Sequence, residues 1–110
     1  MKNAEVIARL NLINKLQQDD VKLPVKVGYA LIRNRKAMEE VYAAYDEKRA
    51  EIMKDKQAAD LTPEEVKEVN ELLSIENEIK LHMITEDDLM QCDEALSLNV
   101  LTALDFMIKE

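Results

Sequence analysis

Apolar residues in the middle third of the chain recur at steps of three and four, the spacing of one face of an α-helix. The pattern predicts one long amphipathic helix over residues 24–57, starting at Pro24 or slipping to Tyr29 because Gly28 weakens the first turn. Its stripe consists of Val27, Leu31, Asn34, Met38, Val41, Tyr45, Lys48 and Ile52. At about 1.5 Å per residue, such a helix is about 50 Å long and needs partners along its length, from the same chain or a copy.

Shorter helical segments flank this one. Asn3 is the expected N-cap of a first helix that runs to Gln18. The sequence Thr62-Pro63-Glu64-Glu65 is a capping box that predicts a third helix from Pro63, antiparallel to the long helix because the loop before it is short. Ser97 is the expected cap of a last helix over residues 98–109, apolar on all sides but one.

Residues 79–84 alternate between apolar and polar side chains, which predicts a short strand, although the spacing of Leu72, Ile79 and Met83 also fits a continuing helix. A strand here needs a partner in residues 94–96, in residues 21–27 or in another subunit. Thr85, followed by three acidic residues, predicts a helix of about one turn.

Composition agrees with a helical protein, since the chain has one Gly and two Pro in 110 residues. The fold class expected is mainly α, in a single domain over residues 1–110. Its architecture is an antiparallel helical hairpin containing the long helix, two further packed helices and a minor short β element. Four methionines, Met38, Met53, Met83 and Met107, lie at core spacings and are interpreted as core filler.

Charge and cysteine content limit the class of protein further. The single cysteine, Cys92, excludes an internal disulfide, and no apolar run has the length of a membrane span or a signal-peptide core. The expected location is therefore a reduced cytoplasm. The net charge of −8 is uneven, because residues 1–60 carry a balance of +2 and residues 61–110 a balance of −10.

The order LPVKVGYALIRN, a long charged helix, NELLSIENEIKLHMITEDDL and LTALDFMIKE resembles a family of small proteins of unknown function from phages and prophages of Gram-positive bacteria. The resemblance covers Leu12 to Glu110 and rests on packing motifs. These are Leu23-Pro24-Val25-Lys26, Glu71-Leu72-Leu73-x-Ile75-Glu76 and Leu104-Asp105-Phe106-Met107-Ile108. The chain departs from the family in the shortened connection over residues 55–65. The resemblance implies a phage or prophage origin and a bacterial cytoplasm, and it supplies no catalytic or ligand-binding residue.

Candidate reactive groups are few. His82 and Cys92 are the only residues of their kinds, and no nucleophile elbow, oxyanion loop or orienting third group accompanies them. His82 with the acidic residues 86–88 is a possible metal site, but the acids are better explained as partners of a helix N-terminus. Phosphate-binding glycine loops are absent from the sequence. We expect no catalytic residue, cofactor or metal.

Interaction is the remaining class of function. The expected contact surface comprises two apolar groups, Leu31, Met38, Val41 and Tyr45 on the long helix and Leu98, Leu101, Phe106 and Ile108 near the C-terminus. A basic cluster of Lys22, Lys26, Arg33, Arg35 and Lys36 has no acid within it. It is expected to meet acidic residues of the same chain or a neighbouring one, which favours self-association, and phosphate of nucleic acid is the less favoured ligand.

Three functions follow from these features. The first is a non-enzymatic protein–protein interaction module, self-associating or bound to a phage or host protein, with no membrane. The second is an acidic factor that takes over the host or counters its defences by imitating nucleic acid in the groove of a bacterial nuclease. It requires solvent-facing carboxylates at Glu64, Glu65, Glu68, Glu71, Glu76 and Glu78. The third is nucleic-acid binding through the basic cluster.

Overall fold

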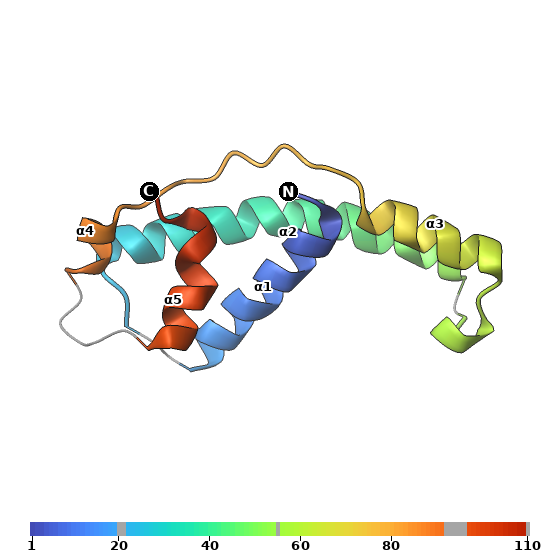
Figure 1. Ribbon diagram of the computed structural model, residues 1–110, viewed down its shortest axis with the longest axis horizontal. Helices are drawn as coiled ribbons and strands as arrows, with labels where there is room; N and C mark the ends of the chain where they lie inside the picture. Colours follow the sequence, from blue (N-terminus) through green and yellow to red (C-terminus); the bar gives the residue numbers. More distant parts are fainter. Residues whose placement is uncertain (20–21, 55, 92–96, 110) are drawn as a thin grey trace.

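The structure, a computed structural model, describes residues 1–19, 22–54, 56–91 and 97–109 and is mainly helical, which confirms the predicted class (Figure 1). Its elements are α1 (Asn3–Gln18), α2 (Val25–Met53), the 3₁₀ turn η1 (Ala58–Asp60), α3 (Pro63–Leu73), α4 (Glu86–Leu89), α5 (Leu98–Leu104) and the 3₁₀ turn η2 (Asp105–Met107). The molecule measures 52 × 26 × 18 Å and has a radius of gyration of 16.6 Å. A compact domain of this length would have about 13 Å, so the molecule is elongated along α2.

Helix α2 is shorter than predicted at its C-terminal end. It begins at Val25, directly after Pro24, so the alternative start at Tyr29 is wrong. It ends because Lys54 adopts the left-handed conformation, with φ 46° and ψ 48°, and donates its backbone N–H to the carbonyl of Ala50. The predicted continuation to residue 57 is therefore wrong.

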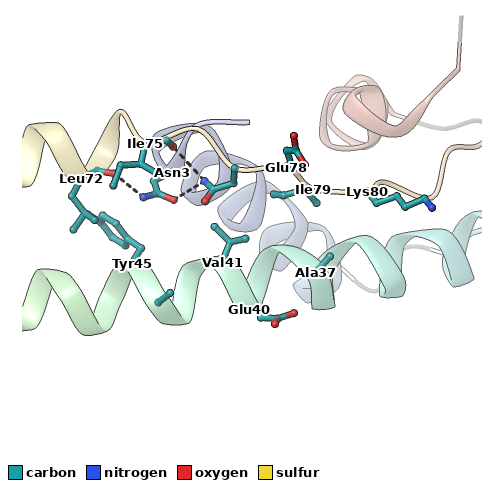
Figure 2. Close-up of a pocket in the computed structure, with 12 residues that line it drawn as sticks. Asn3, Ala37, Glu40, Val41, Tyr45, Leu72, Ile75, Glu78, Ile79 and Lys80 are labelled. Carbon is teal, nitrogen blue, oxygen red and sulfur yellow. Dashed lines mark hydrogen bonds between the residues drawn. The ribbon is translucent and has the colours of Figure 1, made fainter.

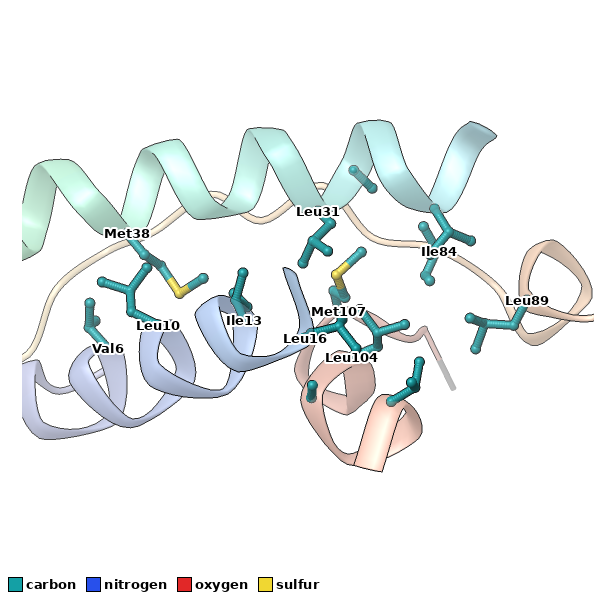
Figure 3. Close-up of a cluster of buried hydrophobic side chains, with 14 residues drawn as sticks. Val6, Leu10, Ile13, Leu16, Leu31, Met38, Ile84, Leu89, Leu104 and Met107 are labelled. Carbon is teal, nitrogen blue, oxygen red and sulfur yellow. The ribbon is translucent and has the colours of Figure 1, made fainter. Parts of the chain in front are cut away.

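The core forms on one side of α2, where α1 packs against α2 and α5 packs against α1 (Figure 3). Leu31 and Met38 point from α2 into this core. The buried cluster comprises Val6, Leu10, Ile13, Leu16, Val27, Ala30, Leu31, Met38, Ile84, Leu89, Val100, Ala103, Leu104 and Met107. These are aliphatic side chains and methionines, so burial of small and branched apolar groups supplies the main stabilisation.

Helix α3 lies along the C-terminal part of α2, beyond the main core (Figure 1). Its predicted capping box is confirmed, because the Thr62 hydroxyl accepts from the Glu65 N–H at 3.2 Å and the Glu65 carboxylate accepts from the Thr62 N–H at 3.0 Å. The ammonium of Lys56 also contacts Glu65 at 3.0 Å. Leu72 is the buried residue of α3. The main body of the molecule is therefore α1, α2 and α5.

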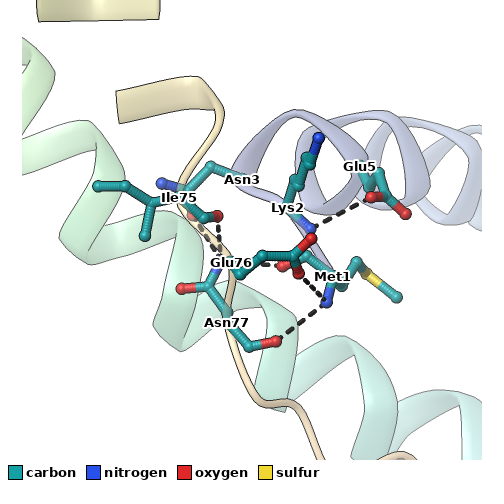
Figure 4. A network of polar contacts seen from close by, with 7 residues as sticks. All are labelled: Met1, Lys2, Asn3, Glu5, Ile75, Glu76 and Asn77. Atoms are coloured by element: carbon teal, nitrogen blue, oxygen red, sulfur yellow. Dashed lines mark hydrogen bonds and ion pairs between the residues drawn. The ribbon is translucent and has the colours of Figure 1, made fainter. Parts of the chain in front are cut away.

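The expected N-cap role of Asn3 is wrong, since Lys2 occupies the N-cap position of α1. Asn3 is buried, and its Nδ2 donates to the carbonyl of Leu72 at 2.6 Å. That carbonyl lies in the last turn of α3, where backbone acceptors have no partner within the helix. Asn77 donates to Asn3 Oδ1 at 2.8 Å, and the N-terminal ammonium contacts Glu76 at 3.1 Å (Figure 4). This polar network ties the chain start to the end of α3.

Residues 75–84, here called the strap, cross the molecule in an extended form between α3 and α4 (Figure 1). The predicted strand over residues 79–84 is wrong, because the strap makes isolated bridges only, Lys2 with Glu76 and Ile84 with Ile108. Between these bridges, Asn34 of α2 hydrogen-bonds the backbone of His82. The strap is therefore held by hydrogen bonds from helix α2 and by single bridges, and not by a neighbouring strand.

Met83 lies in the strap and is 43% exposed, so its interpretation as core filler is wrong. The same interpretation is correct for Met38 and Met107, which are fully buried, and Met53 is half-buried at the end of α2. The difference arises because Met83 belongs to an extended segment, in which helical spacing no longer determines the buried side.

Both C-terminal helices start as predicted, and the last one ends early. Thr85 caps the single turn of α4, and Ser97 caps α5 by accepting from the N–H of Val100 at 3.3 Å. The helix predicted over residues 98–109 ends at Leu104, and η2 follows. The chain turns there because Ile84 pairs with it, donating to the Met107 carbonyl at 2.8 Å and accepting from the Lys109 N–H at 2.6 Å.

Candidate interaction surfaces

The contact surface expected on the long helix is used inside the chain. Leu31, Met38 and Tyr45 are buried, and Val41 is half-buried. Leu31 and Met38 belong to the core with α1 and α5. Since α1 covers this part of α2, Leu31 and Met38 offer no free surface for a partner.

The expected C-terminal surface is divided by the end of α5. Leu98 is 79% exposed and Leu101 is exposed beside it. Phe106 is half-buried, with the guanidinium of Arg9 at 5.6 Å from its ring centre, and Ile108 is half-buried at its bridge with Ile84. Two of the four residues therefore remain at the surface.

The cations of the basic cluster differ in their exposure and contacts. Lys22, Lys26, Arg33 and Lys36 are exposed, whereas Arg35 is half-buried and pairs with Glu39 at 3.5 Å within α2. Arg33 lies 5.8 Å from the centre of the Tyr29 ring and donates to the Tyr29 hydroxyl at 3.1 Å. The His82 ring meets Tyr29 edge-on at 5.8 Å. Arg33 is therefore committed to an aromatic contact and Arg35 to an ion pair within α2.

A second stripe on α2, which sequence reasoning missed, lies on the side opposite the core. We call it the outer face; its members are Val25, Tyr29, Ile32, Lys36, Glu39, Ala43, Asp46 and Ala50. They are separated by alternating steps of four and three residues, so they share one side of the helix. Val25 is 89% exposed, Tyr29 53% and Ile32 45%. Three large apolar side chains therefore stand in a row at the surface.

The charges on and beside the outer face change sign at the middle of α2. The N-terminal half carries Lys26, Arg33 and Lys36, and the C-terminal half carries Glu39, Glu40 and Glu47, all exposed. Asp46 of the same face pairs with Arg49 at 3.4 Å, so these two charges offset each other. The spacing of this face is visible in the sequence, but the face is less apolar than the core stripe on the same helix. The outer face therefore has apolar and basic side chains at its N-terminal end, and small and acidic side chains at its C-terminal end.

A groove of about 600 Å³ lies between α2, the end of α3 and the strap (Figure 2). Val41 and Tyr45 of α2 line it from one side, and Ile75 and Ile79 of the strap from the other. The small side chains of Ala37 and Ala44 leave room in the groove, and Glu40, Glu78 and Lys80 supply its charged groups. The remaining lining residues are Asn3, Leu72 and Asn77. No Ser, Thr, Cys or His belongs to this lining. The groove can hold apolar side chains but contains no nucleophile–base pair.

The reactive groups suggested by the sequence do not come together in the described part of the chain. His82 is exposed, and its ring contacts Tyr29, while Cys92 lies outside the described residues. Among residues 1–19, 22–54, 56–91 and 97–109, no group of three or more acidic, His or Cys side chains could hold a metal ion. Asp88 serves instead as a partner of the α4 N-terminus, accepting from the Thr85 N–H at 3.1 Å.

Among the residues that the structure describes, two carboxyl groups have altered acidity, and both lie in helix caps. The hydrogen bond from the Thr62 backbone, helped by the Lys56 ammonium, lowers the pKa of Glu65 to about 2. The hydrogen bonds from the backbone and side chain of Thr85 lower the pKa of Asp88, and the charge of Lys26 adds to this. Both shifts have structural causes, so they do not mark a catalytic site.

Comparison with protein-family models, with curated proteins and with solved structures gives no match to this chain. Within the described residues, none of the helices combines the length and apolar character that crossing a membrane would require.

Proposed function

We propose that this protein is a non-enzymatic interaction protein of phage or prophage origin, which self-associates and acts in the cytoplasm of a bacterial host. The observation that carries the proposal is the exposed apolar row on α2, formed by Val25, Tyr29 and Ile32. The resemblance to small phage and prophage proteins supports the origin and the location.

Exposure of a contiguous apolar row is costly for a monomer, and such rows usually mark contact sites. In this chain α1 packs on the other side of α2, and the described elements leave the row exposed. A second copy can cover it without any further gene product. The most exposed side chain, that of Val25, would gain the most from burial in such a contact.

Sedimentation equilibrium over a wide range of protein concentrations tests the proposal. The expected result is a mass that rises from 12.7 kDa to at least twice that value as concentration increases. The variant Ile32→Asp is expected to stay at the monomer mass, because a carboxylate would replace an apolar contact. A wild-type protein that remains monomeric at the highest concentration would refute self-association.

A second candidate function is inhibition of a bacterial nuclease by an acidic surface that imitates nucleic acid. It is favoured by the row of Glu64, Glu68 and Glu71, which are exposed at helical spacing on one side of α3. Glu76 and Glu78 of the strap are exposed as well, whereas Glu65 is half-buried against Lys56.

Conversion of Glu64, Glu68 and Glu71 to Gln tests this candidate. Capture of a host nuclease by the wild type and its loss in the triple variant are the expected results, because the opposing basic groove would lose its charge partners. A triple variant that captures the same nuclease equally well would exclude the acidic row. Self-association is expected to survive the triple change, which separates the two candidates.

A further inference from the structure

We infer that α2 pairs in antiparallel orientation with α2 of a second copy through its outer face, and that the change of charge sign along this face fixes the direction. This inference rests on the proposed self-association and adds the surface, the symmetry and the register. The outer face consists of two rows, and the members of each row are seven residues apart. One row is Val25, Ile32, Glu39 and Asp46, and the other is Tyr29, Lys36, Ala43 and Ala50.

Two rows at this spacing form the seam of a two-stranded coiled coil. In an antiparallel pair related by a two-fold axis, each position of one row faces a position of the other row in the second copy. When the axis passes between Lys36 and Glu39, the whole outer face is used. The seam then extends from Val25 to Ala50, about 38 Å of helix.

This register places two of the three exposed apolar side chains against alanine and Tyr29 against Asp46 of the second copy. Ile32 faces Ala43 of the second copy, and Val25 faces Ala50 of the second copy. Alanine at these positions lets the two backbones approach closely, while the larger partner fills the space. A parallel pair in register would instead put Ile32 against Ile32 and leave Ala43 against Ala43, with less uniform packing.

The charges agree with the same register. Lys36 faces Glu39 of the second copy at the centre, and two-fold symmetry makes this contact twice. On the flank of the seam, Arg33 comes next to Glu40 of the second copy, and further out Lys26 comes next to Glu47 of the second copy. A parallel pair would bring Lys36 against Lys36 and Glu39 against Glu39 of the second copy, so the charges at the centre of the seam favour the antiparallel direction.

The described structure leaves this face accessible. α1 packs on the opposite side of α2, where Leu31 and Met38 point, and α5 packs on α1 (Figure 3). The Glu39 side chain is 55% exposed although it pairs with Arg35 at 3.5 Å in its own helix. A lysine from a second copy can therefore reach it. The basic and apolar end of the outer face and its acidic, alanine-containing end complement each other. Because both ends lie on one helix, the partner that fits the face is a second copy of this chain.

Charge reversal tests the inference. In Lys36→Glu, the new glutamate would face Glu39 of an identical copy, and in Glu39→Lys, the new lysine would face Lys36. Each variant alone is expected to raise the dissociation constant about tenfold or more. Mixed in equal amounts, the two variants are expected to form a heterodimer within about threefold of the wild-type affinity, because both contacts then join opposite charges.

Matched controls are Lys67→Glu and Glu71→Lys, which reverse the same charges on the exposed side of α3. They are expected to leave the dissociation constant within about twofold of wild type. Circular dichroism of each variant verifies that the helices are retained. Sedimentation equilibrium of the separate and mixed variants gives the dissociation constants.

The outcomes separate this inference from the proposed function. Weaker self-association of each variant alone, with affinity recovered in the mixture, supports the antiparallel contact. A wild type that self-associates while both variants do so equally well refutes the outer face but leaves self-association standing. Loss in both variants without recovery in the mixture refutes the register. A monomeric wild type refutes both proposals.

Discussion

Asn34 holds the backbone of His82 in both directions, donating from Nδ2 to its carbonyl at 2.9 Å and accepting at Oδ1 from its N–H at 2.7 Å. A buried side chain of α2 thereby makes the pair of hydrogen bonds that a neighbouring strand would make. The same amide lies 3.6 Å from the sulfur of Met107. One asparagine thus connects the long helix, the strap and the C-terminal turn.

Replacement of Asn34 by leucine is expected to lower the free energy of unfolding by about 2–3 kcal/mol. Two hydrogen bonds are lost, and the backbone groups of His82 are left without partners in a partly buried place. Urea denaturation measures the change. The control is Asn14→Leu on the exposed side of α1, expected to change stability by less than about 0.5 kcal/mol. Equal stability of the two variants would show that the strap is held elsewhere.

The Glu65 cap makes stability depend on pH. Its pKa is lowered from 4.5 to about 2 in the folded protein, so its contribution is fully present above 4.5 and is lost as the pH falls toward 2. Glu65→Gln is therefore expected to be less stable than wild type near neutral pH, and the difference should shrink between pH 4.5 and 2. Denaturation midpoints of both proteins across this range measure it. In Glu64→Gln, which leaves the cap contacts intact, no such pH-dependent difference is expected.

Lys54 adopts a conformation that suits glycine, with φ 46° at the end of α2. Lys54→Gly is expected to raise the free energy of unfolding by about 0.5–1 kcal/mol, because glycine occupies the left-handed region without a Cβ clash. Thermal and urea denaturation measure the gain. Lys48→Gly, within the same helix, should lower it by about 1 kcal/mol. A loss of stability in both variants would mean that Lys54 makes a favourable contact of its own.

Local patterns explain which elements the sequence could predict. The period of α2 and the capping box of Thr62 and Glu65 are encoded within a few residues, so their positions follow from spacing and from cap chemistry. The mainly helical class follows from the same signals. Even so, the end of α2 at Lys54 was missed because this residue carries no glycine signal.

The strap could not be predicted, because its partner is distant in the chain. Asn34 is 48 residues away from His82, and the alternation over residues 79–84 resembles that of a true strand. The same reasoning applies to Asn3, whose buried amide donates to the carbonyl of Leu72 and does not cap its own helix. An isolated polar residue in an apolar stripe is the available signal, but the sequence does not tell which backbone it will contact.

The candidate surfaces were only partly predictable for a related reason. Periodicity identifies the side of α2 that is apolar, but it does not tell whether the partner is α1 or another molecule. Leu31 and Met38 therefore became core, while Leu98 of α5 stayed exposed. The outer face is less apolar on average, and it is recognised only when the exposure of Val25 and Ile32 is known.

Two methionines provide a test of where the core ends. Met107 is fully buried in η2 beside Asn34, whereas Met90 is 81% exposed after α4. Met107→Ala is expected to lower the free energy of unfolding by about 2–4 kcal/mol, because it removes buried apolar volume and leaves a cavity. Met90→Ala should change it by less than about 0.5 kcal/mol. Urea denaturation of both variants measures the two changes. A similarly small decrease in the free energy of unfolding of both would mean that the C-terminal turn does not belong to the folded core.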